Sequence, residues 1–197
     1  MIYNKLRAKL EMNRDPLQDC LWQEIQMHSK LIMIEKNEIL IDFGSKHRYT
    51  YFIVSGSFLA SVISEAGVKR AIWFHFDELF STISAVDSYF MNKPSPYAYK
   101  AMEDSMVIQF HKQKIDDWIA QYPTFSQIYF NGIIRDYSAL YEISAFRISN
   151  SPIQFLEFIK TKYPTILERV SSKNMAHFLG VSPEWYSKLK RKRKALN

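Results

Sequence analysis

The sequence predicts an α+β protein in which a β-rich first part is followed by a long helix and then by a small helical domain. Three observations lead to this prediction. Between about residues 31 and 110, short stretches of β-branched and aromatic residues alternate with turn residues, which is typical of an all-β sandwich or barrel. After Pro123 the apolar residues recur every three or four positions, as on a helix. The chain beyond Pro152 is helical in composition and ends in a basic run.

The composition is that of a globular protein with its excess charge at one end. A chain of 197 residues with 47% apolar residues can bury a sizeable core. The net charge is +6, and residues 188–194 supply six of the 26 basic residues, which leaves 20 basic and 20 acidic residues in the rest. This asymmetry indicates a polyanionic partner, either nucleic acid or an anionic membrane surface.

The single cysteine and the first 15 residues exclude several classes of protein, among them disulfide-stabilised and secreted proteins. Cys20 alone excludes an internal disulfide framework and any iron–sulfur or metal site built only from cysteines of one chain. We expect Cys20 to be a small buried residue. The first 15 residues carry scattered charges, unlike a secretory signal, and no stretch has 18 consecutive apolar residues. We therefore expect a cytoplasmic protein without a membrane span.

The β-rich part divides into strands at its turn residues. Gly56 lies between two strands, and Pro94 and Pro96 mark a loop at residues 91–99, since proline cannot donate to a strand ladder. The other boundaries are Asn37, Gly44 and Gly67. The strand-like stretches are LIMIEKNEILIDFG, YTYFIVSGSFLASVIS, EAGVKRAIWFHF and SMVIQFH.

One long helix is expected over residues 124–147, with an apolar stripe repeating at spacings of three and four. Ile134, Tyr141 and Ala145 widen this stripe beyond what one neighbouring element would cover. We interpret it as a dimerisation surface; the alternative is packing against the β-rich part. The breaker Ser149–Pro152 ends the helix, so we predict domains at 1–122, 123–148 and 149–197. The stripe consists of Phe130, Ile133, Tyr137, Leu140 and Ser144.

The C-terminal region has the spacing of a helix-turn-helix. Ser172 is the expected N-cap of its first helix, Ala176 is small where the two helices cross, and Gly180 allows the sharp turn. Ser182 can cap the second helix with Pro183 in its first turn. The remaining core positions are Met175, Leu179, Val181, Tyr186 and Leu189.

The second helix of this motif presents residues suited to reading DNA. Glu184 could accept a hydrogen bond from a cytosine amino group, and Lys188 or Arg191 could bind guanine acceptors. An acid within a basic helix argues against a purely nonspecific tail. The full set of candidate DNA-binding residues is Ser172, Ser182, Pro183, Glu184, Ser187, Lys188, Lys190, Arg191 and Arg193, of which Lys190 and Arg193 are expected on phosphates.

The chain resembles the Crp/Fnr family of bacterial transcription regulators over residues 31–193. The resemblance is carried by YFIVSGSFLASVISEAGVKRAIWFHF around Gly56, by KPSPYAYKAMEDSMVIQF, and by SSKNMAHFLGVSPEWYSKLKRK. It implies a jelly-roll-like, cyclic-nucleotide-binding-type β-roll, a long helix that pairs two subunits, and a C-terminal helix-turn-helix domain. It also implies a near-palindromic DNA operator, a homodimer, and RNA polymerase as a further partner.

The sequence departs from the nucleotide-binding members of that family. Those members carry Gly-Glu in a short helix after the sixth strand and Arg-Ser or Arg-Thr later. Here Ser81-Thr82 replace the first pair and Pro94-Ser95 the second, and Lys93 lacks the two-pronged geometry of arginine. The resemblance therefore implies a degenerate effector pocket at Ser81, Thr82, Lys93 and Ser95 that does not bind cyclic AMP. No cofactor is expected, and the effector is left open.

Two other functions remain as alternatives. The basic end could anchor an adaptor to a membrane surface or an acidic partner. His75, Asp77 and Glu78 are the only local cluster of metal-ligand types, which leaves a metal-dependent β-roll protein as the second alternative. No Ser-His-Asp order, glycine-rich phosphate loop or pair of catalytic carboxylates stands out, so we expect no enzyme. Gly180→Val should abolish DNA binding if the helices can then no longer cross.

Overall fold

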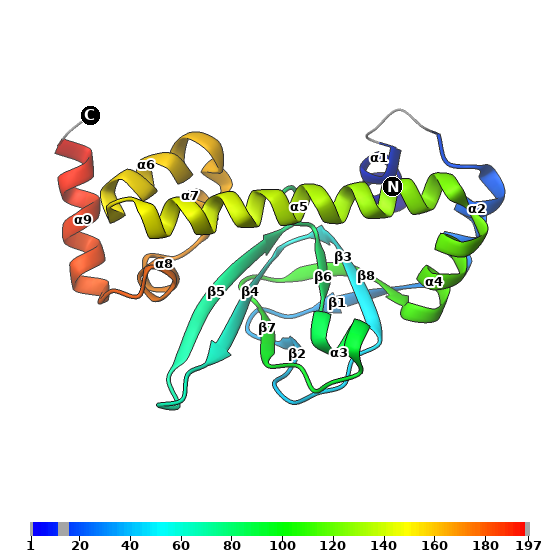
Figure 1. Cartoon of the computed structure of the whole chain (residues 1–197), viewed down its shortest axis with the longest axis horizontal. Helices are drawn as coiled ribbons and strands as arrows, with labels where there is room; N and C mark the ends of the chain where they lie inside the picture. The colour runs from blue at the N-terminus through cyan, green and yellow to red at the C-terminus, as the bar shows by residue number, and fades with distance from the viewer. Residues whose placement is uncertain (1, 12–15, 196–197) are drawn as a thin grey trace.

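The computed structural model describes residues 2–11 and 16–195, with side chains up to Arg191. It has the predicted α+β class: a β-roll of two sheets, a long helix that runs along the roll, and a cluster of helices at the C-terminal end (Figure 1). The strands are β1 (Ser29–Ile34), β2 (Ile39–Ile41), β3 (Tyr49–Ser55), β4 (Ser57–Ile63), β5 (Lys69–Phe76), β6 (Thr82–Ser84), β7 (Tyr97–Ala101) and β8 (Ser105–His111).

The roll is made of two four-stranded antiparallel sheets with orders β1-β8-β3-β6 and β2-β7-β4-β5. Alternate residues of both sheets face the interior, where Tyr51, Ile53, Phe58 and Tyr99 are buried together. Side-chain alternation along a strand explains this, because every second residue lies on the same face. The interior is thus a packed core.

The turn between β3 and β4 requires glycine. Gly56 has a φ of +103°, and a Cβ atom there would lie 2.1 Å from the Ser105 hydroxyl oxygen. That hydroxyl accepts the N–H of Ser57 at 3.3 Å, so the close approach also satisfies a buried donor. The predicted pair of strands around this turn is confirmed.

Three helices that the sequence did not predict cover the outer face of the first sheet: α1 (Ile2–Leu10), α2 (Asp19–Met27) and α4 (Lys112–Gln121). The Trp118 indole N–H of α4 donates to Glu24 of α2 at 2.9 Å. The expectation that Cys20 is buried was wrong. Helix α2 turns Leu21 and Ile25 toward the core, which leaves Cys20 on the exposed side.

The segment after β5 differs from the expectation. Helix α3 (Val86–Met91) follows β6, so Thr82, expected in a short helix, is the first residue of a strand. The loop expected over residues 91–99 is shorter, because Met91 still belongs to α3 and Tyr97 already begins β7. Asn92 ends α3 with the left-handed φ of 55°, a conformation that asparagine tolerates better than most residues.

The predicted long helix is present as α5 (Pro123–Ser149) and extends slightly beyond residues 124–147 at both ends. Pro123 occupies its first turn, where a missing N–H costs nothing. Helix α5 buries Phe125, Ile128 and Ile143 against the rest of the chain.

In the part of the chain that the structure describes, four helices follow α5: α6 (Pro152–Lys162), α7 (Pro164–Arg169), α8 (Ser172–Leu179) and α9 (Pro183–Ala195). Ser151 caps α6 in a capping box with Gln154. Phe155 of α6 and Phe178 of α8 share one core with Phe74 and Phe76 of β5. The division at 1–122, 123–148 and 149–197 remains a prediction, but this core joins the last segment to the first.

Among the helices in the described residues, none is long and apolar enough to cross a membrane.

The Gly56 turn gives a stability prediction. We expect Gly56→Ala to lower the free energy of unfolding by about 3 kcal/mol or more, because a strained backbone costs about 1–3 kcal/mol and overpacking costs a similar amount. Gly67→Ala is the matched control, since Gly67 also has a positive φ (+73°) but nothing within 4 Å of its added Cβ. It should cost only about 1–2 kcal/mol. Urea unfolding measures both, and equal losses would contradict the role of Ser105.

Candidate nucleic-acid interface

The N-cap of helix α8 lies one residue earlier than expected. Ser171, with extended backbone angles, is the N-cap, and its hydroxyl accepts the N–H of Asn174 at 3.2 Å. The prediction of Ser172 as the cap was therefore wrong by one position. Ser172 is the first helical residue, and its hydroxyl lies 3.3 Å from the Lys190 ammonium of α9. Two adjacent serines offer the same chemistry, and only the backbone angles distinguish them.

The turn between α8 and α9 is closed by backbone hydrogen bonds around Gly180. Its N–H donates to His177 O at 3.2 Å, and the N–H of Val181 donates to Ala176 O at 3.0 Å, as in a Schellman motif. Ala176 is fully buried, in keeping with its predicted place where the helices cross. Gly180 has a φ of +72° with nothing within 4 Å of an added Cβ. The prediction that Gly180 allows the sharp turn is confirmed, because its left-handed backbone favours glycine.

Helix α9 starts with the predicted cap at Ser182. Its hydroxyl accepts the N–H of Trp185 at 3.1 Å. Hydrogen bonds from its own backbone N–H and from Ser182 lower the pKa of the Glu184 carboxyl, as expected for an acid in the first turn of a helix. The Ser187 hydroxyl donates to the Pro183 carbonyl at 2.9 Å, so its oxygen remains only an acceptor toward other groups.

One face of α9 is fixed in the core while the other is open. Tyr186 and Leu189 are buried. Lys190 is half-buried, and its ammonium lies 5.9 Å from the Tyr186 ring centroid. The side chain of Arg193 lies outside the described residues. The exposed predicted residues are Ser182, Pro183, Glu184, Ser187, Lys188 and Arg191.

Trp185 belongs to the same surface, and the sequence reasoning did not select it. Its side chain is 42% exposed on the third residue of α9. On a helix, Glu184 and Lys188 point away from the buried pair, while Trp185 and Lys190 fall on opposite flanks. The available signal was a large apolar residue beside the core stripe, four positions before Leu189, that the stripe itself does not need.

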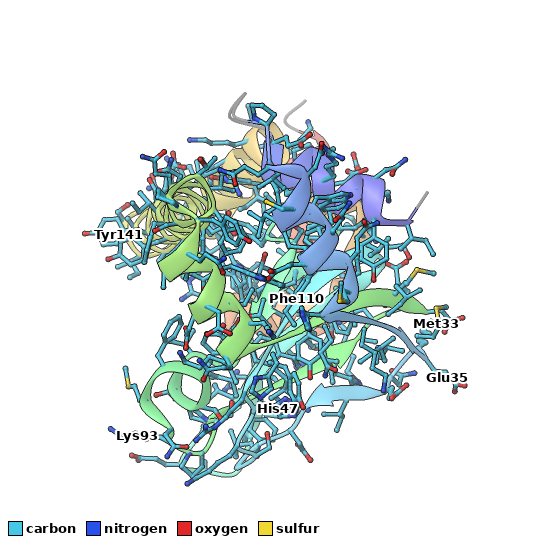
Figure 2. All side chains as sticks on the ribbon, turned by 90° about the vertical axis from the view of Figure 1, so that its right-hand side faces the viewer. Met33, Glu35, His47, Lys93, Phe110 and Tyr141 are labelled. Carbon is cyan, nitrogen blue, oxygen red and sulfur yellow. The ribbon has the colours of Figure 1, made fainter. Side chains whose placement is uncertain are left out.

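Helix α5 leaves its predicted stripe uncovered. Ile134 is 62% exposed and Tyr137 is 63% exposed, whereas Ile143 on the opposite side is buried. Figure 2 shows Tyr141 pointing away from the roll. The helix packs on the protein through a different set of residues, so the alternative of covering the stripe with the β-rich part does not hold. Phe130, Ile133 and Leu140 are also exposed, and Ser144 is half-buried.

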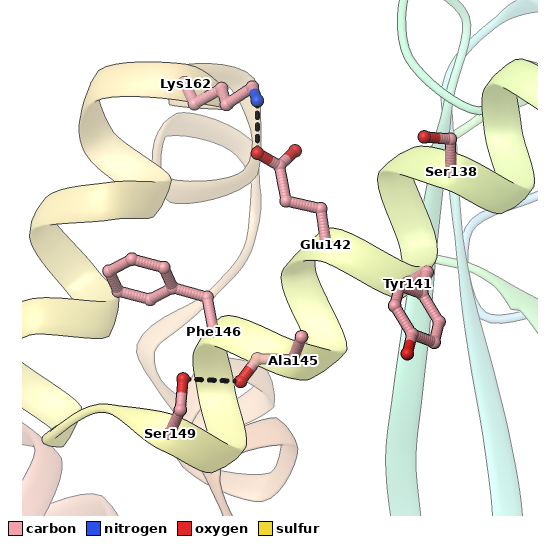
Figure 3. A pocket seen from close by; sticks show the side chains of 7 residues that line it. All are labelled: Ser138, Tyr141, Glu142, Ala145, Phe146, Ser149 and Lys162. Atoms are coloured by element: carbon pink, nitrogen blue, oxygen red, sulfur yellow. Dashed lines mark hydrogen bonds and ion pairs between the residues drawn. The ribbon is translucent and has the colours of Figure 1, made fainter.

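A shallow hollow continues this stripe toward α6 (Figure 3). On its wall the Glu142 carboxylate accepts hydrogen bonds from the Lys162 ammonium and, at 3.0 Å, from the Tyr163 hydroxyl. The hydrogen bond from Lys162, assisted by that from Tyr163, lowers the pKa of Glu142. The hollow is lined by Ser138, Tyr141, Glu142, Ala145, Phe146, Ser149 and Lys162.

The fold of the whole chain is similar to that of several solved regulators. FixK2 from Bradyrhizobium japonicum is similar over 85% of this chain and 85% of its own, with 13% identity and a TM-score of 0.67. The c-di-GMP-responsive regulator CLP of Xanthomonas campestris is similar over 90% of this chain and 92% of its own, with 11% identity and a TM-score of 0.69. A CooA mutant from Carboxydothermus hydrogenoformans is similar over 95% of this chain and 84% of its own, with 12% identity and a TM-score of 0.66. The chain has the Crp/Fnr fold. No protein-family model and no curated protein matches its sequence.

Within this Crp/Fnr fold, two of the four residues of the expected effector pocket are buried with local hydrogen bonds, and the other two are exposed. Ser81 is buried, and its carbonyl accepts the N–H of Ile53 at 2.8 Å. Thr82 and Lys93 are exposed. The buried Ser95 hydroxyl donates to its neighbour Tyr97 O at 2.8 Å.

The cluster expected for the metal alternative is likewise dispersed. The Nδ1–H of His75 donates to the Phe80 carbonyl at 2.9 Å, and burial lowers the pKa of His75 to about 4. Asp77 is paired with Arg169 at 2.6 Å, and Glu78 is exposed. Within residues 2–11 and 16–195, no three histidine, cysteine or acidic side chains are grouped to hold a metal ion.

The Gly180 turn can be tested by two substitutions. Gly180→Asn should keep the free energy of unfolding within about 1 kcal/mol, because asparagine tolerates a left-handed backbone. Gly180→Val should cost at least about 2 kcal/mol, because a branched side chain does not. Thermal and urea unfolding followed by circular dichroism compare the two. Equal damage by both variants would contradict the left-handed backbone as the reason for glycine at this position.

Proposed function

We propose that this chain is a cytoplasmic, sequence-specific DNA-binding transcription regulator that acts as a homodimer and is not controlled by cyclic AMP. The observation that carries the proposal is the surface of α9, where Glu184, Lys188 and Arg191 are exposed while Tyr186 and Leu189 fix the helix in the core. The Crp/Fnr fold supports this function by analogy, as it does RNA polymerase as a further partner.

Helix α9 reads bases with its outward face. The first residues of the second helix of such a motif enter the major groove. There Glu184 accepts a hydrogen bond from a cytosine amino group, and Lys188 or Arg191 donates to guanine. Ser182 and Ser187 complete the base-facing surface, with Ser187 acting as an acceptor because its proton is committed to Pro183.

The flanks of α9 meet the two walls of the groove. Lys190 lies beside Ser172, so this pair faces one phosphate wall, and Arg193 adds charge further along. Trp185 lies on the opposite flank, where its indole N–H can donate to a phosphate oxygen and its ring can pack on a deoxyribose. Such contacts fix the register of the helix without reading sequence.

The α5 stripe is the proposed dimer interface. Exposed apolar residues at spacings of three and four along a 27-residue helix fit a second copy of the same helix. A two-fold dimer presents two α9 helices to half-sites about one helical turn apart, so the operator should be a near-palindrome.

The roll is proposed to work without cyclic AMP. A bound nucleotide would have to replace Tyr51, Phe58 and Tyr99 in the interior. The family positions for the ribose and phosphate contacts hold Thr82, which faces solvent, and Ser95, whose hydroxyl is used by its own loop. Any effector must therefore bind elsewhere or be absent.

The base-reading surface is tested by selecting bound fragments from genomic DNA at near-physiological salt. We expect a near-palindromic motif, a changed base preference for Glu184→Ala, and a uniform loss of affinity for Lys190→Ala. Trp185→Phe, which removes only the indole N–H, should weaken all sequences alike by about 3- to 10-fold, the effect of one hydrogen bond. Sequence-blind retention that vanishes steeply with salt would favour the adaptor alternative.

The dimer interface is tested by placing a charge in the stripe. Tyr137→Glu should raise the dimer dissociation constant about 100-fold or more, since an unpaired buried carboxylate costs several kcal/mol. Asn131→Glu is the control, because Asn131 is exposed on α5 but lies outside the stripe. Sedimentation equilibrium measures both. A monomeric wild-type chain, or equal effects of the two variants, would refute this interface.

A further inference from the structure

Arg169, the last residue of α7, joins the C-terminal helices to two loops of the roll. Its guanidinium nitrogens pair with Asp77, between β5 and β6, at 2.6 Å, and with Glu103, between β7 and β8. The same guanidinium lies 5.3 Å from the centroid of the Phe76 ring. We call Arg169, Asp77 and Glu103 the Arg169 clasp.

The two carboxylates of the clasp are held from the roll side as well. The Ser57 hydroxyl donates to Glu103 at 2.6 Å. Lys5 of α1 lies 3.4 Å from Asp77 and donates to Val54 O at 2.9 Å. Partial burial opposes ionisation of Glu103, but the hydrogen bonds from Ser57 and Arg169 outweigh it and lower the pKa of this carboxyl. Glu103 is therefore charged at neutral pH, and hydrogen bonds from both sides hold its carboxylate in place.

The clasp fixes the orientation of the C-terminal helices on the roll, where the remaining contact is apolar. Helix α8 packs on β5 through Phe178, whose ring lies 5.3 Å from that of Phe74 and 6.2 Å from that of Trp73. Apolar packing is non-directional, so it tolerates small rotations of one element on another. An arginine that binds two carboxylates has a fixed fork geometry and tolerates much less.

We propose that the Arg169 clasp sets the spacing of the two half-sites in the operator. It fixes the orientation of α9 relative to the roll and α5, and hence the separation of the two α9 helices in the dimer. Arg169 acts here as a positioning residue, since it is not on the DNA-facing surface of α9. The inference rests on the proposed function and adds to it the element that selects half-site spacing.

The test measures binding to the selected operator and to versions with the half-sites one base pair closer or further apart. We expect the wild type to prefer one spacing by about 10-fold or more, and Arg169→Met to reduce that preference to about 2-fold, with the affinity lost mainly at the preferred spacing. Fluorescence anisotropy gives the affinities. Lys162→Met is the control, because it breaks the ion pair with Glu142 but does not touch the roll.

Two further variants guard against simple misfolding. Arg169→Lys keeps the charge but cannot fork, and Asp77→Asn with Glu103→Gln keeps the shapes but removes the charges; both should also broaden the spacing preference. If these folded variants lose thermal stability but keep the wild-type spacing preference, the clasp is only structural and the proposal is wrong. If the wild type binds no operator, the proposed function fails as well, and if it binds with no spacing preference, only the clasp proposal fails.

Discussion

The packing of the C-terminal helices against β5 is the interaction on which the rest of this structure depends. Phe178 and Phe155 meet Phe74 and Phe76 in one core that belongs equally to the roll and to the helices. Without this contact, the C-terminal helices would be joined to the roll mainly through helix α5 and the Arg169 clasp. With it, α9 becomes part of the same body as the roll, and its outer face can stay polar and exposed.

The roll is packed both in its interior and against the C-terminal helices. An all-β roll with a hollow interior can hold a ligand, whereas here Tyr51, Phe58 and Tyr99 fill the interior. The outer surface of the second sheet, at β5, carries the α8 contact instead. On the proposed function, the roll is a platform for the helices, and helix α5 runs along it with one side packed and the other side exposed.

Much of the fold could be predicted from local signals. Gly56 and the alternating aromatic residues around it predicted β3 and β4, and the three-and-four spacing predicted α5. Helices α1, α2 and α4 were missed because their apolar faces are short and gain stability only from partners far away in sequence, such as Glu24 for Trp118. The Arg169 contacts join residues 92 and 66 positions apart, a distance over which residue spacing carries no information. Trp185 was missed because an apolar residue on a helix is usually assigned to the core.

The exposed stripe of α5 would make the fraction of dimer depend on the concentration of the protein. On the proposed function, a lone subunit keeps Ile134, Tyr137 and Tyr141 in water, and pairing is a second-order process. Dimers then become scarce faster than the chain itself when expression falls. Occupancy of an operator would then depend steeply on the number of protein molecules in the cell. The rates of synthesis and degradation of the protein would control DNA binding in place of a small-molecule effector.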